Sequence, residues 1–150
     1  MKKIISFIFF IFIVGCGYQP LFDAQKLNFS INKIEYEKNK LNRLIAQELN
    51  AYQNEKDVEH KYNLKIFSYE NKKITLKDKK GNPSNLRLSL STEIEVFDNQ
   101  KLIFKKEYKE SFEYQNTPKK FELRKYEDRI RQSMLGQISN RIINDLYSIK

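Results

Sequence analysis

Cysteine, histidine and tryptophan are scarce in this sequence of 150 residues, which has one Cys, one His and no Trp. Without a second cysteine the chain cannot form an internal disulfide bond, so its fold must rely on a hydrophobic core. His60 stands in a charged segment, Glu55 to Lys61, and we interpret it as a solvated loop residue. The sequence also lacks a glycine-rich phosphate loop and any metal-ligand spacing. We therefore predict a protein that is not an enzyme, with no catalytic residue, no metal and no cofactor.

Long hydrophobic runs are also scarce, and the main one lies at the N-terminus. Residues 4–14 read IISFIFFIFIV, with Ser6 as their only polar residue, and they follow Lys2 and Lys3. A membrane-spanning helix needs about 20 apolar residues, so this run is too short to remain in a bilayer. A basic start, a short apolar core and a small residue at its end are typical of a secretory signal peptide.

The end of that segment carries a second signal. Residues 13–16, Ile-Val-Gly-Cys, fit the lipobox, in which the cysteine is linked to diacylglycerol, becomes the new N-terminus after cleavage and is then acylated. We predict lipidation at Cys16, with a signal peptide at 1–15, a lipidated tether at 16–25 and a single domain at 26–150. The alternative is an ordinary signal peptide followed by a buried cysteine.

Lysine and arginine outnumber the acidic residues, 28 against 19. Such an excess favours acidic partners such as phosphates, nucleic acid or anionic lipid headgroups. Because a secretory signal directs the protein out of the cytoplasm, nucleic acid is excluded. An anionic lipid or glycolipid, a protein, or no charged partner remain as possibilities.

Hydrophobic periodicity predicts an α+β domain. The first half of the domain is expected to form a strand over 26–36 with a bulge near Asn32, a helix over 39–54 capped by Asn39 or Asn42, and a strand over 61–78 that is broken or strongly twisted near Asn71. A hairpin loop at 79–83 then leads to a strand over 86–96, and a turn at 98–100 leads to a strand over 102–114. The last element is a helix with Thr117 as N-cap and Pro118 as its first residue. Each strand and helix has one apolar face. This order, β-α-β-β-β-α, predicts a two-layer sandwich in which two helices pack on one face of a four-stranded, mostly antiparallel sheet.

Basic residues cluster around the expected hairpin. Its members are Lys72, Lys73, Lys77, Lys79, Lys80 and Arg87. Flexible ammonium groups on a projecting loop suit a polyanion. A solvated hairpin tip without a ligand is the alternative.

The residues after Cys16 add a family resemblance. Gly17 to Phe22, Gly-Tyr-Gln-Pro-Leu-Phe, resembles the start of the mature LptE-like proteins, the LPS-assembly lipoproteins, of the alphaproteobacterial type. The order of strands and helices is also similar to that family's. The resemblance implies a non-enzymatic outer-membrane lipoprotein that plugs the lumen of the β-barrel LptD from the periplasmic side and helps deliver lipopolysaccharide to the outer leaflet. It further implies that basic loop residues bind lipopolysaccharide, for which Lys77, Lys79, Lys80 and Arg87 are the candidates here.

A second function fits the same sequence features. A lipoprotein facing the periplasm could have a structural or scaffold role in envelope or barrel assembly, with no glycolipid partner. The two functions differ in whether a large β-barrel accompanies the protein.

Overall fold

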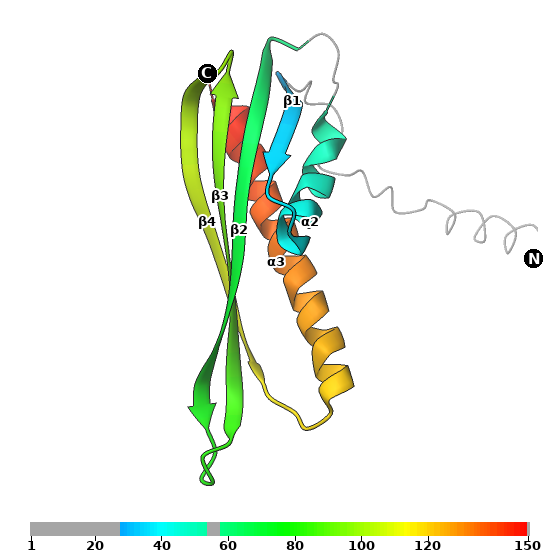
Figure 1. Ribbon diagram of the computed structural model, residues 1–150, viewed down its shortest axis with the longest axis vertical. Helices are drawn as coiled ribbons and strands as arrows, with labels where there is room; N and C mark the ends of the chain where they lie inside the picture. Colours follow the sequence, from blue (N-terminus) through cyan, green and yellow to red (C-terminus); the bar gives the residue numbers. More distant parts are fainter. Residues whose placement is uncertain (1–27, 54–57, 150) are drawn as a thin grey trace, which may run out of the picture.

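The computed structural model describes residues 28–53 and 58–149, so Cys16 and the predicted signal peptide and tether lie outside the described residues. A four-stranded sheet forms one layer and two helices form the other, on the same face of the sheet (Figure 1). In chain order the elements are β1 (Phe29–Tyr36), α2 (Lys40–Leu49), a 3-10 turn (Asn50–Tyr52), β2 (His60–Lys77), β3 (Pro83–Asp98), β4 (Lys101–Gln115) and α3 (Lys120–Ser148). The predicted α+β class and element order are confirmed.

The strands lie side by side in the order β1-β2-β3-β4. β1 runs parallel to β2, and the other two pairs are antiparallel. The register of β1 shifts between Ile31 and Lys33, which confirms the predicted bulge. The β3–β4 turn places Asn99 and Gln100 at positive φ, 44° and 71°, as a two-residue hairpin turn requires.

Of the two proposed caps for the first helix, Asn39 is the one that acts. Its side-chain oxygen accepts a hydrogen bond from the backbone N–H of Asn42 at 2.8 Å. Ile45 and Leu49 on the buried face of α2 then enter the core without solvent exposure.

The predicted start of the second helix is wrong. α3 begins at Lys120 rather than at Pro118, and its N-cap, Lys119, makes no side-chain capping bond. Asn116 is still held to the sheet, because its backbone N–H donates to the carbonyl of Ser84 at 2.8 Å and its side chain donates to Pro83 at 2.8 Å. The chain therefore needs the residues between Asn116 and Lys120 to cross from the sheet layer to the helix layer.

His60 is not a loop residue, contrary to the prediction. It is the first residue of β2, is half-buried and stacks on Tyr62 with ring centroids 5.9 Å apart. The parallel pairing with Phe29 extends the strand one residue beyond its predicted start. His60 thus has a packing role at the edge of the core.

β2 changes character along its length. Over residues 60–66 it pairs with β1, from Asn63 onward it also pairs with β3, and Tyr62, Leu64 and Ile66 are buried. β1 pairs no further than Ile66, and from Tyr69 to Lys77 every residue of β2 is exposed. The strand is unbroken at Asn71. The sequence is irregular there because this part of β2 no longer pairs with β1 and its side chains are exposed.

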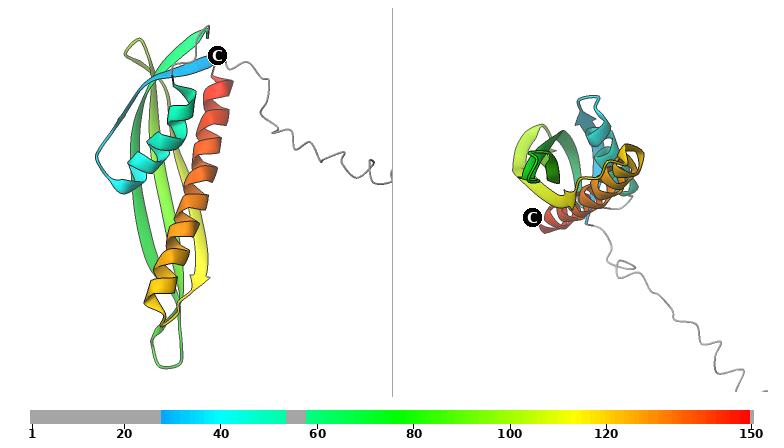
Figure 2. Two further views of the ribbon diagram at one scale, coloured as in Figure 1. Left: turned by 90° about the vertical axis from the view of Figure 1, so that its right-hand side faces the viewer. Right: turned by 90° about the horizontal axis from the view of Figure 1, so that it is seen from below.

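The β2–β3 hairpin projects beyond the start of α3 (Figures 1 and 2). We call residues 70–87 and 113–131, which include this hairpin and the first turns of α3, the distal end. The remaining described residues form the proximal part, where α2, β1 and the later turns of α3 pack.

α3 is fixed to β4 by two similar side-chain groups, one in each part of the molecule. Near the distal end, Glu127 accepts hydrogen bonds from the Tyr114 hydroxyl at 2.6 Å and from Lys72. In the proximal part, Asp145 accepts hydrogen bonds from the Tyr108 hydroxyl and from Lys106, each at 2.6 Å. We call these groups the distal and proximal clasps.

Candidate functional site

The tip of the β2–β3 hairpin is a structured turn. One carboxylate oxygen of Asp78 accepts the backbone N–H groups of Lys80 at 2.8 Å and Asn82 at 2.9 Å. The hydrogen bonds from Asn82 and its neighbours hold the pKa of Asp78 below its ordinary value. Gly81 adopts φ +83°, which closes the turn. The predicted loop is confirmed, and it holds Lys79 and Lys80 at the exposed extremity of the molecule.

Positive charge is concentrated at the distal end. Its sequence holds twelve lysines and arginines against six acidic residues, whereas the proximal part holds eleven against ten. Several distal cations form no ion pair with any described residue: Lys73, Lys77, Lys79, Lys80, Lys120 and Arg124. An excess of unneutralised cations at one end of a small domain attracts anionic partners to that end.

An apolar groove lies beside two of these cations. Ile74 and Leu86 of the hairpin and Leu123 of α3 line a depression of about 440 Å³, and Lys120 and Arg124 also line it. Ile74 and the nearby Leu76 are 50% and 57% exposed. Exposed aliphatic side chains beside basic groups form an amphipathic surface.

The distal clasp holds the two walls of this groove together. Glu127 is buried, which disfavours its charged form, but the hydrogen bonds from Lys72 and Tyr114 outweigh burial and hold its pKa below the ordinary value. Burial and the bond to Glu127 in turn raise the pKa of Tyr114. Because Lys72 comes from β2 and Glu127 from α3, this group fixes the hairpin against the helix.

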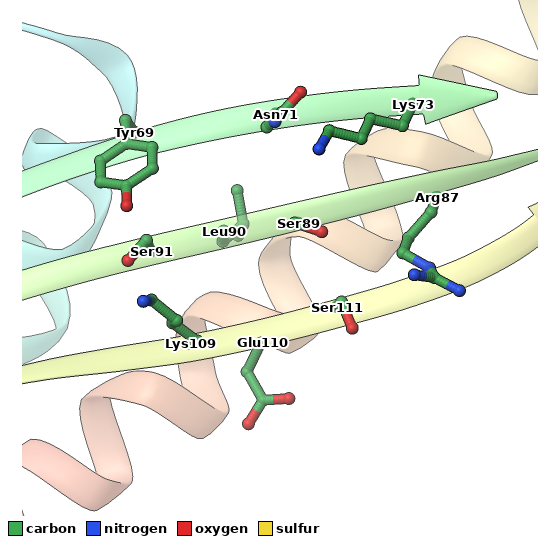
Figure 3. Close-up of a pocket in the computed structure, with 10 residues that line it drawn as sticks. All are labelled: Tyr69, Asn71, Lys73, Arg87, Ser89, Leu90, Ser91, Lys109, Glu110 and Ser111. Atoms are coloured by element: carbon green, nitrogen blue, oxygen red, sulfur yellow. The ribbon is translucent and has the colours of Figure 1, made fainter. Parts of the chain in front are cut away.

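The structure divides the basic residues that the sequence grouped together. Lys77, Lys79 and Lys80 lie at the hairpin tip, as predicted. Lys72 belongs to the distal clasp. Arg87 and its cross-strand neighbour Lys73 lie on the opposite face of the sheet, away from the helices (Figure 3). Of the four predicted lipopolysaccharide-binding residues, three therefore lie at the hairpin tip, and Arg87 lies further along β3 on the sheet face that the helices leave uncovered.

Lys120 and Arg124 are the residues that the sequence prediction missed. They begin α3 about forty residues after the hairpin and meet it only in the folded protein. A signal was present, since Lys119, Lys120 and Arg124 stand at a helix N-terminus where the helix dipole disfavours positive charge. Cations at that position are an energetic cost that an anionic partner would offset.

The described residues also bear on two other kinds of site, membrane-spanning helices and metal-binding clusters. None of the helices described is long and apolar enough to span a membrane. Over residues 28–53 and 58–149, no three His, Cys, Asp or Glu side chains are placed to hold a metal ion.

Comparison with known proteins identifies the fold. No protein-family model matches the chain, and no curated protein sequence matches it. Among solved structures, the rare lipoprotein B from Shewanella oneidensis aligns with a TM-score of 0.57 and 18% identity over 78% of this chain and 95% of its own. A minor lipoprotein from Acinetobacter baumannii aligns with a TM-score of 0.60 and 16% identity over 79% of this chain and 91% of its own. At such identities the likeness establishes a shared fold.

A third structure shows how far the sequence can vary within this fold. A lipoprotein B from Nitrosomonas europaea aligns with a TM-score of 0.59 over 83% of this chain and 88% of its own, at 7% identity. The two-layer arrangement of Figure 1 is therefore one that bacterial lipoproteins of different sequence adopt.

Proposed function

We propose that this protein is a non-enzymatic outer-membrane lipoprotein that plugs an LptD-type β-barrel and takes part in lipopolysaccharide transport to the outer leaflet. The observation that carries the proposal is the basic, apolar-lined distal end on a fold that solved bacterial lipoproteins share. The lipobox at Cys16 and the residues that follow it support the same conclusion from the sequence.

The distal end suits an anionic amphiphile. The exposed cations at the hairpin tip, Lys77, Lys79 and Lys80, can meet phosphate groups without demanding a fixed geometry. The groove beside Ile74 and Leu123 offers apolar surface for part of an acyl chain. A ligand with phosphates next to acyl chains would contact both features at once, and lipopolysaccharide is such a ligand.

The rest of the molecule suits a position inside a barrel. The sheet face that the helices leave uncovered carries charged side chains near the β3–β4 turn, among them Glu93, Glu95 and Lys105. The lumen of an outer-membrane barrel is polar as well. Acyl chains on Cys16 would anchor the protein at the periplasmic side, since two or more chains hold a protein to a membrane far more stably than one.

Purification from native membranes in mild detergent tests the plug role. We expect a large β-barrel protein to co-purify with the lipoprotein in equal amounts. Recovery of the lipoprotein alone, or with barrel-assembly components only, would overturn the proposal in favour of a scaffold role.

Charge reversal at the distal end tests glycolipid binding. The test variant carries four substitutions, Lys79→Glu, Lys80→Glu, Lys120→Glu and Arg124→Glu. We expect it to bind purified lipopolysaccharide at least about tenfold more weakly, because each of these cations can form a charge-assisted hydrogen bond with an anionic group of the glycolipid. The matched control reverses Lys61, Lys101, Lys38 and Arg43, exposed cations of the proximal part that form no ion pair with the described residues. Equal losses in the two variants would show that net charge alone governs binding and would remove the distal site.

A further inference from the structure

A second depression lies on the sheet face that the helices leave uncovered. Its volume is about 590 Å³, within the range of roughly 300–1,000 Å³ typical of small-molecule sites. It is hollow because Asn71, Ser89 and Ser111, three small residues, form one row across β2, β3 and β4. Larger side chains border this row on both sides, Lys73 and Arg87 on one and Tyr69 and Lys109 on the other (Figure 3). We call this depression the open-face trough.

The floor of the open-face trough offers hydrogen bonds. The side chains of Asn71, Ser89 and Ser111 form no hydrogen bond with any described residue, so their hydroxyl and amide groups are available to a ligand. An acyl chain here would remove these groups from water without replacing their hydrogen bonds, which is unfavourable. The trough therefore suits a polar ligand, in contrast to the distal groove.

Tyr69 adds an aromatic surface at one end. The Tyr69 hydroxyl donates to Glu107 at 3.0 Å, which orients the side chain, and 58% of the residue is exposed. The face of an aromatic ring carries partial negative charge and attracts the C–H groups of a sugar ring. The ring lies beside Ser91 at the end of the trough opposite Lys73 (Figure 3).

Lys73 and Arg87 form a like-charged pair of which only Arg87 has an acidic partner among the described residues. They stand directly opposite each other on β2 and β3, and like charges at such positions destabilise a sheet. Arg87 pairs with Glu113 at 3.1 Å, but Lys73 forms no ion pair with a described residue. In Figure 3 the Lys73 side chain reaches back toward the middle of the trough.

A second like-charged pair on the same face shows how such repulsion is usually resolved. Glu93 and Glu107 also stand opposite each other. Lys105 lies 2.9 Å from Glu93, and Lys109 lies 2.7 Å from Glu107, so both carboxylates are neutralised. Arg87 has Glu113 as its partner, so an anion beside Lys73 would complete the same arrangement with the opposite sign.

We propose that the open-face trough binds an acidic oligosaccharide, with a phosphate or carboxylate group at Lys73 and Arg87, hydroxyl groups on the Asn71–Ser89–Ser111 row, and a sugar ring against Tyr69. The ligand is the saccharide portion of an anionic glycolipid, and this choice of source rests on the proposed function. The acyl and saccharide portions would then be bound by different surfaces of the protein.

Binding of a lipid-free probe to the full-length lipoprotein in detergent tests the proposal. The probe is the phosphorylated core oligosaccharide released from lipopolysaccharide by mild acid, and isothermal titration calorimetry measures its affinity. We expect Lys73→Glu and Ser89→Tyr each to weaken binding by about tenfold or more, because the first removes a charge-assisted contact and the second fills the floor. The control Lys61→Glu, the same charge change on the same strand outside the trough, should stay within about twofold of the unmodified protein.

The proposal that the trough binds an acidic oligosaccharide would be overturned if the oligosaccharide did not bind or if Ser89→Tyr had no effect. An equal loss of affinity in Lys61→Glu, or equal affinity for an acidic peptide of the same charge, would overturn it as well. Neutral dextran oligosaccharides should not bind, and dextran binding as tight as that of the acidic probe would contradict the role of Lys73. Since Lys73 and Ser89 are not core residues, thermal melting should show both variants folded. The two proposals can fail separately. If intact lipopolysaccharide binds while the oligosaccharide does not, the proposed saccharide site is wrong and the proposed function stands. If no barrel co-purifies, the proposed function fails whatever the oligosaccharide does.

Discussion

The two parts of β2 belong to one strand and are placed very differently. In residues 60–66 the side chains on the helix-facing side, Tyr62, Leu64 and Ile66, are buried against the helix layer. In residues 67–77 the same side presents Glu70, Lys72 and Ile74, which are exposed. β1 and α2 cover the first part only, so β2 becomes an edge strand beyond Ile66. The comparison shows that one continuous strand can supply core in the proximal part and a charged surface in the distal end.

The largest expected effect tests this difference directly. Leu64→Ala should lower the free energy of unfolding by about 2–5 kcal/mol, because Leu64 is fully buried and its removal leaves a cavity. Ile74→Ala, on the same side of the same strand, should cost roughly 1 kcal/mol or less because half of that side chain is already in water. Urea unfolding monitored by circular dichroism measures both. Equal losses would contradict the division of β2 into a core half and a surface half.

The two clasps give the next largest effect. Tyr108→Phe and Tyr114→Phe each remove one hydrogen bond to a charged carboxylate, and each should cost about 1.5–3 kcal/mol. Tyr114→Phe should also speed amide hydrogen exchange in the first turns of α3, because the distal clasp ties that part of the helix to β2 and β4. Tyr36→Phe serves as the control, since Tyr36 is exposed and its hydroxyl forms no hydrogen bond in the described residues. Unfolding midpoints unchanged from the unmodified protein would show that the clasps are incidental contacts.

Two glycines, one in α3 and one at the tip of the β2–β3 hairpin, give the next comparison. Replacing each with alanine should change the free energy of unfolding in opposite directions. A Cβ added at Gly136 would meet no atom within 4 Å, so Gly136→Ala should raise the free energy of unfolding by about 1 kcal/mol through helix propensity. Gly81→Ala should lower it by about 1 kcal/mol, because φ is +83° there and a side chain is strained in that conformation. Thermal unfolding of the two variants gives the comparison. A loss of stability in Gly136→Ala would mean that α3 needs the flexibility of glycine.

The smallest expected effect is a change in folding stability as the pH is lowered. The pKa of Glu127 and that of Asp145 are both held below their ordinary values, because the hydrogen bonds from lysine and tyrosine outweigh the effect of burial. A depressed pKa contributes stability above the value in the unfolded chain, 4.5 for Glu127, and this contribution is lost as pH falls through the folded value. The stability difference between the unmodified protein and Glu127→Gln should therefore narrow between about pH 5 and pH 3. Melting temperatures measured across this range provide the test, and a difference that widens toward acid would reverse the assigned sign.

Much of the fold could be predicted from sequence because its signals are local. The alternation in β3 and the turn chemistry around Gly81 each depend on a few neighbouring residues, and both predictions are confirmed. Local sequence also limited the cap of α2 to Asn39 or Asn42, of which the structure uses Asn39. The start of α3 was predicted wrongly because Asn116 remains tied to Ser84, a contact between distant segments.

The candidate site was less predictable. The sequence pointed to Lys79 and Lys80, which a single turn presents, but it could not show that Arg87 lies on the other sheet face from the groove. Lys120 and Arg124 join the site only through the packing of α3 beside the hairpin. The pattern of unfavourable charge at the helix start was the one local sign of their role.

Local sequence was enough to predict the order and apolar faces of the strands and helices, the hairpin turns and the basic excess around the β2–β3 tip. These features depend on backbone propensity and side-chain periodicity along short stretches. Three features could be seen only in the folded protein: where β1 and the helices stop covering β2, which cations share a face of the sheet, and that Lys72 meets Glu127, 55 positions away in the chain. The physical reason is that burial and charge neutralisation depend on which distant segments come together, and the spacing of residues along one segment does not contain that information.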